Sequence, residues 1–308
     1  MCRRRDAVRI LGEHRVREAL SSGEFASPWT GVLVDPARAT EPSIVIAAAW
    51  LASGPDAIVS GPTAAFLHGY TAAEPTPVHV VVPYGSKRRT RPGLVVHNGR
   101  SLDTDARVID GLPVLCLERV VTDLLCTAAP AGALAVADQV LAGLAQDARP
   151  AFRDEIHRRL RERPDPRGTR IGARLLDLAT GAAESPAESW LLWRIVDLGF
   201  PVPTVNHWVC TIDGEPRFRV DLSWPELRIA VEYYGHLSHD GREELDEARI
   251  LELERRGWIV VVVRADDLSS MSRVEREIDA AFRRRGMHPR ERIGGALRAR
   301  RHREPRAG

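Results

Sequence analysis

A nearly uninterrupted apolar segment near the C-terminus, WIVVVVR at residues 258–264, places the strongest constraint on the fold. A strand that is apolar on both faces must be covered on both faces, which is typical of the centre of an α/β sheet. A helical segment at 243–256 precedes it, and the helical segment VEREIDAAFRRR follows. Three strand-like segments separated by turn residues come before that pair: TVNHWVCTIDG, PRFRVDLSW and LRIAVEYYG. This order predicts an α/β domain over 171–285, with a mixed sheet flanked by helices.

The N-terminal half alternates helical and strand-like segments at shorter intervals. The segment 1–40 resembles the end of a winged helix, with a helix over 7–21 and a strand over 29–34, but it lacks the about three helices of a complete one. Residues 41–163 predict an α+β domain. Its helices are expected at 44–52, 62–69, 117–128, 133–145 and 151–163, and its strands at 57–60, 77–83, 93–98 and 111–116. The Pro-, Gly- and Arg-rich segment 163–170 predicts the domain boundary.

Composition excludes several classes of protein. No apolar run approaches the ~20 residues that cross a bilayer, and no secretory signal is readable, so we expect a cytoplasmic protein. The four cysteines are scattered without a CxxC pair, which predicts reduced thiols rather than a zinc or redox motif. Lys87 is the only lysine, so a catalytic lysine elsewhere in the chain is excluded.

Positive charge is concentrated in two places. The loop SKRRTRPG contains Lys87, Arg88 and Arg89, and ten arginines lie between 283 and 306 against two acids. We expect residues 286–308 to be a disordered tail, and the pattern favours DNA as a partner, because arginine and lysine neutralise backbone phosphates. The residues predicted to contact DNA are Lys87, Arg88, Arg89, Arg283, Arg284 and Arg285. The alternative is a solvated tail without a specific partner.

Three acids carry the candidate chemistry. Asp221 ends the strand RFRVD, Glu232 lies in LRIAVEYYG across a Pro-containing turn, and Glu188 lies on the helix before them. If the two strands pair, Asp221 and Glu232 converge near one edge of the sheet as ligands for Mg²⁺, and Glu188 supplies a third carboxylate.

Each acid also has a structural interpretation. Glu188 is three residues after Ser185, as in a capping box. Asp221 could accept backbone N–H groups at the end of its strand. Glu232 is flanked by apolar residues, where an unpaired carboxylate is costly, so a role in the site is favoured. Asp246 and Arg249 are spaced as a surface ion pair, and His68 is placed to cap a helix C-terminus beside Gly69.

The C-terminal pattern resembles the very-short-patch-repair (Vsr)-like branch of the PD-(D/E)XK nuclease superfamily. The resemblance covers about residues 185–268 and rests on AESWLLWRIVDLGFP, RVDLSWPELRIAVEYYG and DEARILELERRGWIVVVV. It implies a restriction-endonuclease-like fold and a site made of Glu188, Asp221, Glu232, Gly235, His236 or His239, Asp246, Arg249, Gly257 and Trp258. By the resemblance, Asp221 and Glu232 would hold Mg²⁺, and His236 or His239 would transfer protons.

Two positions depart from that family. Its Glu-x-Asp-Gly motif reads Glu232-Tyr233-Tyr234-Gly235, and the lysine of the wider superfamily is missing because no lysine follows residue 87. Tyrosine, with a reference pKa of about 10, is a poor Mg²⁺ ligand and a poor base near pH 7.

The first 160 residues are similar to the AbiEi-type antitoxin region, through TGVLV, SGPTAAFLHG, PVHVVVP, GLPVLCLERVVTDLL and ALAVADQVL. This resemblance implies a DNA-binding autorepressor, with a toxin gene operator or a cognate toxin as partner. Three functions stay open from the sequence: a DNA-binding regulator with a nuclease fold of weakened or lost catalysis, an active Mg²⁺-dependent DNA endonuclease, and an interaction protein without enzymatic activity.

Overall fold

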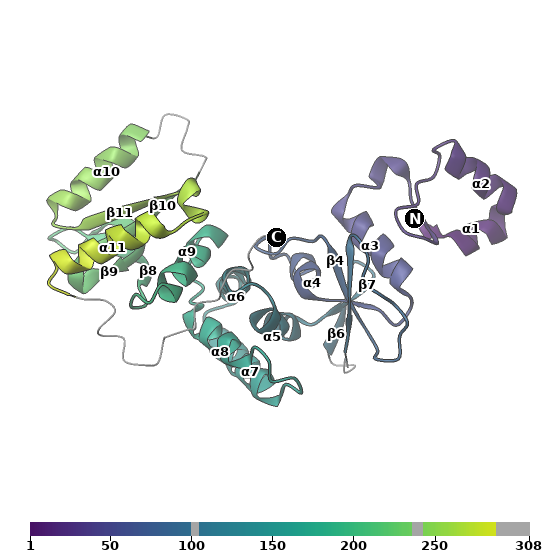
Figure 1. Ribbon diagram of the computed structural model, residues 1–308, viewed down its shortest axis with the longest axis horizontal. Coiled ribbons are helices and arrows are strands. Elements are labelled where there is room, and N and C mark those ends of the chain that lie inside the picture. Colours follow the sequence, from purple (N-terminus) through teal and green to yellow (C-terminus); the bar gives the residue numbers. More distant parts are fainter. Residues whose placement is uncertain (100–104, 236–242, 288–308) are drawn as a thin grey trace. The chain divides into compact units, whose positions relative to one another are not determined.

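The computed structural model describes residues 1–99, 105–235 and 243–287, with only the backbone of 243–246. Over these residues the chain has the predicted α/β fold (Figure 1). It divides into two compact units, one made of residues 1–128 with 147–173 and the other of 129–146 with the chain from 174 onward. Within the described ranges, no helix has the length and apolar character needed to cross a membrane.

The first unit begins with two short helices and a small strand pair. Its elements are β1 (Cys2–Arg3), α1 (Arg4–Leu11), α2 (Glu13–Ser21) and β2 (Val32–Leu33), with β1 antiparallel to β2. The single helix predicted over 7–21 is wrong. Gly12 adopts φ 84° and ψ 154°, a conformation open to glycine, and this residue separates α1 from α2. The strand predicted over 29–34 is reduced to β2.

A five-stranded mixed sheet is the centre of the first unit, with strand order β5-β4-β3-β7-β6. The elements around and within it are α3 (Pro42–Ser53), β3 (Ile58–Val59), α4 (Gly61–Leu67), β4 (Val78–Val82), β5 (Leu94–Asn98), β6 (Ala106–Ile109), β7 (Leu112–Leu115), α5 (Leu117–Thr127) and α7 (Arg149–Glu162). All the helices and strands expected here are present. The short edge strand β6 was not predicted, because its largely exposed pattern leaves it without an apolar signal.

The helix α6 (Pro130–Gly143) belongs to the second unit, although its sequence position placed it in the 41–163 domain. It packs against α9 (Pro186–Asp197). Asp138 of α6 is buried and holds the segment before α9 and α9 itself. Its Oδ1 accepts from the N–H groups of Thr180 at 2.7 Å and Gly181 at 2.9 Å. Its Oδ2 accepts from the Ser189 hydroxyl of α9 at 2.7 Å. The other division, at 173/174, lies shortly after the predicted boundary 163–170, within α8 (Thr169–Leu178).

A four-stranded sheet with the order β11-β10-β9-β8 forms the rest of the second unit. Its elements are β8 (Thr204–Cys210), β9 (Pro216–Trp224), β10 (Ile229–Tyr234), α10 (Glu243–Arg255), β11 (Ile259–Arg264) and α11 (Ser272–Arg284). The predicted mixed sheet is confirmed: β10 and β11 are parallel, and β8, β9 and β10 are antiparallel neighbours. In Figure 1 the helices α10 and α11 lie on different sides of these strands.

Candidate functional site

Asp221 and Glu232 come together as the sequence predicts. β9 pairs with β10 through Ala230 with Ser223 and Val231 with Leu222, and this register, continued by one residue, sets Glu232 opposite Asp221. The Oδ2 of Asp221 accepts the backbone N–H of Tyr233 at 2.7 Å. The carboxylate of Asp221 thus bonds to the neighbouring strand, as the interpretation of a strand-end acid predicts.

Glu232 is 2% exposed and is paired with a cation. The Nη2 of Arg249, on α10, lies 3.1 Å from Glu232 Oε1 and also donates to the backbone carbonyl of Arg219. A buried carboxylate needs such a partner, because the loss of its hydration is not otherwise offset. Arg249 thus connects α10 to the sheet. The expected ion pair with Asp246 stays a prediction, because the Asp246 side chain is outside the described residues.

Glu188 caps its own helix. The Ser185 hydroxyl accepts the N–H of Glu188 at 3.2 Å and donates to Glu188 Oε1 at 2.8 Å. The Oε2 of Glu188 accepts from the N–H of Glu184 at 2.9 Å and from Nδ2 of Asn206 at 3.0 Å. The predicted capping interpretation is confirmed, and the buried carboxylate also ties α9 to β8.

The charges of neighbouring residues act on the carboxyl group of Asp221. Burial raises the pKa of Asp221 to about 6, and the negative charges of Glu188 and Glu184 act in the same direction. The N–H of Tyr233 and the charge of Arg249 oppose this rise in pKa without cancelling it. The pKa of Asp221 is therefore set mainly by burial, and the neighbouring charges make smaller contributions.

These contacts do not fit a Mg²⁺ site. Magnesium requires carboxylate oxygens free to enter an octahedral shell, whereas Glu232 is paired with a guanidinium and Glu188 caps a helix. Over the described ranges, no group of three or more His, Cys, Asp or Glu side chains is placed to hold a metal ion. The predicted proton-transfer residues His236 and His239 lie outside the described residues.

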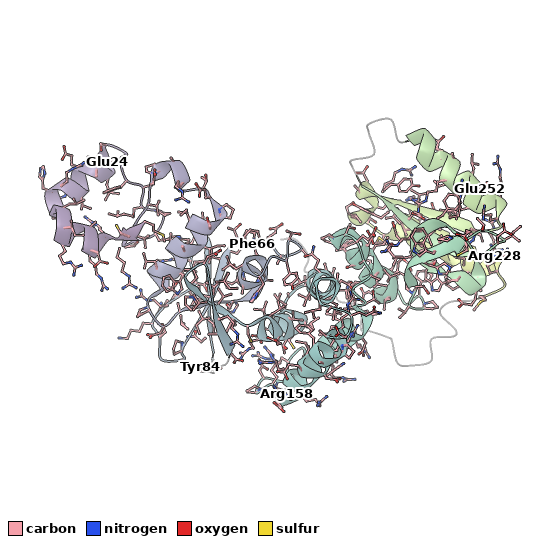
Figure 2. The ribbon with its side chains drawn as sticks, turned by 180° about the vertical axis from the view of Figure 1, so that it is seen from behind. Glu24, Phe66, Tyr84, Arg158, Arg228 and Glu252 are labelled. Carbon is pink, nitrogen blue, oxygen red and sulfur yellow. The ribbon has the colours of Figure 1, made fainter. Side chains whose placement is uncertain are left out.

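The predicted DNA-contact residues fall into two different settings. Lys87, Arg88 and Arg89 are exposed in the loop between β4 and β5, and in the described structure none of them forms an ion pair. Tyr84, 71% exposed, precedes them in the same loop (Figure 2). The loop is thus a free basic surface.

The arginines at the end of α11 are more constrained. Arg283 pairs with Asp279 at 2.6 Å. Arg285 donates to the backbone carbonyls of Gly257 and, at 3.4 Å, Arg228. Arg228 is in the left-handed conformation, with φ 48°, so Arg285 supports the turn before β10 rather than extending into solvent. Arg284, the last residue of α11, is exposed, and the arginines from 290 onward lie outside the described residues.

Asn206 and His68 make contacts that the sequence did not predict. Asn206 adopts φ 52° inside β8 and donates to the Ala182 carbonyl at 2.6 Å as well as to Glu188. Asn tolerates this conformation better than most residues, but a strand sequence gives no sign of it. His68, expected as a helix cap, is the C-cap of α4, and its Nε2 lies 2.8 Å from the Leu115 carbonyl.

Comparison with known families finds a match in one part of the chain. Residues 57–178 match the AbiEi antitoxin C-terminal domain. The resemblance to AbiEi antitoxins predicted from the sequence is thereby confirmed for this range. The AbiEi-type domain contains the loop between β4 and β5, and it ends before the strands that hold Asp221 and Glu232.

Two curated relatives extend over most of the chain. The uncharacterized proteins MT2308 and Rv2248 of Mycobacterium tuberculosis, strains CDC 1551 and H37Rv, are each 29% identical over 273 residues, covering 85% of this chain and 95% of the relative. Among solved structures, the RV2827C protein of Mycobacterium tuberculosis matches with a TM-score of 0.39 and 17% identity, covering 65% of this chain and 77% of that chain.

Proposed function

We propose that the protein is a DNA-binding, antitoxin-type regulator whose C-terminal unit is a Vsr-like nuclease scaffold without catalysis. A toxin gene operator is the DNA we infer for it, and a cognate toxin is the protein partner. The match to the AbiEi antitoxin C-terminal domain supports the regulatory part of the proposal. The Glu232–Arg249 pair is the observation that carries the choice between regulator and nuclease.

Charge in the AbiEi-type domain supports DNA as the ligand. Residues 75–102 contain no acid, so the positive charge of the loop between β4 and β5 is not neutralised from within its own segment. Exposed lysine and arginine side chains of this kind bind backbone phosphates and release counterions, whatever the base sequence. Tyr84 adds an exposed aromatic ring to the same loop.

The contact between Arg249 and Glu232 supports the loss of catalysis, whereas the arginine itself belongs to the family pattern. In a metal nuclease, the divalent ion is the cation that the strand carboxylates share. Here the guanidinium of Arg249 reaches Glu232 from α10 and is fixed by a second bond to the Arg219 carbonyl. Tyr234 in place of the family's second acid removes a further oxygen ligand.

An active endonuclease is the second candidate, and the pKa of Asp221 favours it. A carboxyl group that titrates near pH 6 next to other acids is typical of sites that bind cations or accept protons. If this function is correct, a divalent cation would displace Arg249 from Glu232. An interaction protein that binds no nucleic acid is the third, and DNA-binding measurements separate it from the other two.

Salt-dependent binding tests the DNA proposal. Fluorescence anisotropy of a labelled duplex from upstream of the protein's own gene would be measured from low to physiological salt. The variant K87Q/R88Q/R89Q is expected to lower the slope of log K against log salt by up to about 3, because each lost phosphate contact contributes about 1.

The matched control removes three charges from α7, as R153Q/R158Q/R161Q. All three arginines lie on α7, outside the loop between β4 and β5, so this variant is expected to keep the wild-type slope. Arg158 (Figure 2) is in addition paired with Glu155 at 2.6 Å and with Glu162. Equal slopes for both triple variants would remove the loop from the interface. Absence of any salt-sensitive binding would leave the interaction-protein alternative.

Cleavage assays test the scaffold proposal. Supercoiled and mismatched DNA would be incubated with wild-type protein, D221A and E232A in Mg²⁺ or Mn²⁺, and no metal-dependent cleavage is expected from any of them. Cleavage by the wild type that both variants lose would establish the endonuclease and refute the scaffold.

A further inference from the structure

Two histidines from neighbouring strands of the first unit face each other. β4 and β5 are parallel, with His79 opposite Val95 and Val81 opposite His97, so the two histidines lie diagonally on the same face. Their ring centroids are 5.2 Å apart, and Nδ1 of His79 lies 3.0 Å from Nε2 of His97. One ring nitrogen must donate its proton to the other at this distance.

The spacing of these nitrogens matches the distance between two ligands of one transition-metal ion. Metal–imidazole bonds are about 2.0–2.1 Å long, so two nitrogens at adjacent positions of a square or tetrahedral shell are separated by about 2.9–3.4 Å. The observed 3.0 Å lies within this range. We propose that Nδ1 of His79 and Nε2 of His97 form a binding site for a divalent transition-metal ion of the Zn²⁺ class.

His97 is exposed and His79 is half-buried. On the other side of the His79 ring is Gly61, where a Cβ would lie 3.1 Å from Nδ1, so a side chain at this position would crowd the coordinating nitrogen. Ser60 donates its N–H to the His79 carbonyl at 3.0 Å and holds the strand in place.

Both imidazoles are ready to act as neutral ligands. Their Nδ1–Nε2 hydrogen bond requires one inner nitrogen to carry a hydrogen and the other to be a bare acceptor. Binding the ion requires the shared proton to move from the inner nitrogen of the donor ring to the outer nitrogen of the same ring. Both inner lone pairs then face the metal, and no net proton is released.

The site would be open and would select against Mg²⁺. Imidazole suits zinc, copper and nickel rather than magnesium. In the described structure no third His, Cys, Asp or Glu side chain joins the pair, so water would complete the coordination shell. The ion would connect the edge strand β5 to β4, and these two strands hold both ends of the basic loop.

Titration calorimetry with Zn²⁺ on the full chain at pH 7.5 tests the site, using wild type, H79Q and H97Q. The matched control H14Q changes an exposed histidine of α2, and H236Q/H239Q removes two other potential zinc ligands. One Zn²⁺ per chain is expected to depend on His79 and His97. Each of their variants should bind at least about tenfold more weakly, because even outer-shell changes cost 10–100-fold in metal affinity. The controls should keep this event, and its enthalpy should not depend on the ionisation enthalpy of the buffer.

Imidazole ¹⁵N NMR provides a measurement independent of whether H79Q folds. Addition of Zn²⁺ is expected to shift the Nδ1 resonance of His79 and the Nε2 resonance of His97, assigned through H97Q. Unchanged resonances at saturating Zn²⁺, or equal affinity in H97Q and wild type, would overturn the proposal. Since H97Q changes an exposed residue, its result does not depend on repacking.

Discussion

Replacement of Arg249 by methionine leaves a buried carboxylate without its cation. Glu232 is 2% exposed, whereas the Arg249 side chain is 29% exposed. Removal of one partner of a buried ion pair typically costs about 3–5 kcal/mol, and the partial exposure of Arg249 places the expected cost near about 3 kcal/mol. About 1 kcal/mol of this comes from the lost bond to the Arg219 carbonyl.

A double-mutant cycle separates the charge from the packing. In E232Q/R249M no charge remains in the pair, so the double variant is expected to be about 1–2 kcal/mol more stable than R249M. Urea unfolding would be followed by tryptophan fluorescence, which reports the second unit through Trp224 and Trp258. If R249M were within about 0.5 kcal/mol of wild type, or if the double variant were no more stable than R249M, the buried-pair reasoning would be refuted.

The same variant has a predictable dependence on pH. Without Arg249, the folded-state pKa of Glu232 rises above its unfolded value of about 4.3. The protonated form is then favoured by folding, so the stability deficit of R249M relative to wild type is expected to shrink as pH falls from 8 to 5. A deficit that stays constant over this range would show that Glu232 is not the group left uncompensated.

Three further variants test the framework of the site. D221N removes a carboxyl whose folded pKa of about 6 exceeds its unfolded value of about 3.9, so the wild-type protein loses stability as pH rises from about 4 through 6. In urea unfolding, D221N should gain about 2 kcal/mol over wild type between pH 4 and 8. Parallel pH profiles of the two proteins would contradict this. D138A leaves two N–H groups and the Ser189 hydroxyl without their acceptor and should cost about 3–5 kcal/mol, a loss that D138N should only partly restore. S185A removes the N-cap of α9 and should cost about 1 kcal/mol by thermal unfolding, and no change would mean that Glu188 caps the helix alone.

The elements of the second unit could be predicted because several independent signals agree at each of them. The apolar run of β11, the alternation in β9 and the Ser185–Pro186 start of α9 each determine one element locally. Signals of this kind were absent for β6. The break at Gly12 was missed because the apolar spacing continues across it, although glycine in the middle of a helix is itself a warning.

Contact partners were harder to predict than elements. Asp138 lies within the apolar segment ALAVADQVLAG, and the sequence gives no indication that its acceptors would be used by a segment 42 residues later. Likewise, Arg249 was assigned to Asp246 because i, i+3 neighbours are known from sequence alone. The partner that the described residues show, Glu232, lies on a strand, and only the packing of α10 on the sheet brings the two together.

The three acids of the nuclease-like pattern show why residue identity alone could not decide the chemistry. Each carboxylate is satisfied by a different kind of donor: helix N-terminal groups for Glu188, a strand N–H for Asp221, and a guanidinium for Glu232. All three donors are parts of the fold, so the arrangement needs no metal to be stable. Burial is the main cause of the raised pKa of Asp221, and the charges of Glu188 and Glu184 add to it. The donors come from the start of α9, from β10 and from α10, so the role of each acid depends on packing that the sequence pattern does not show.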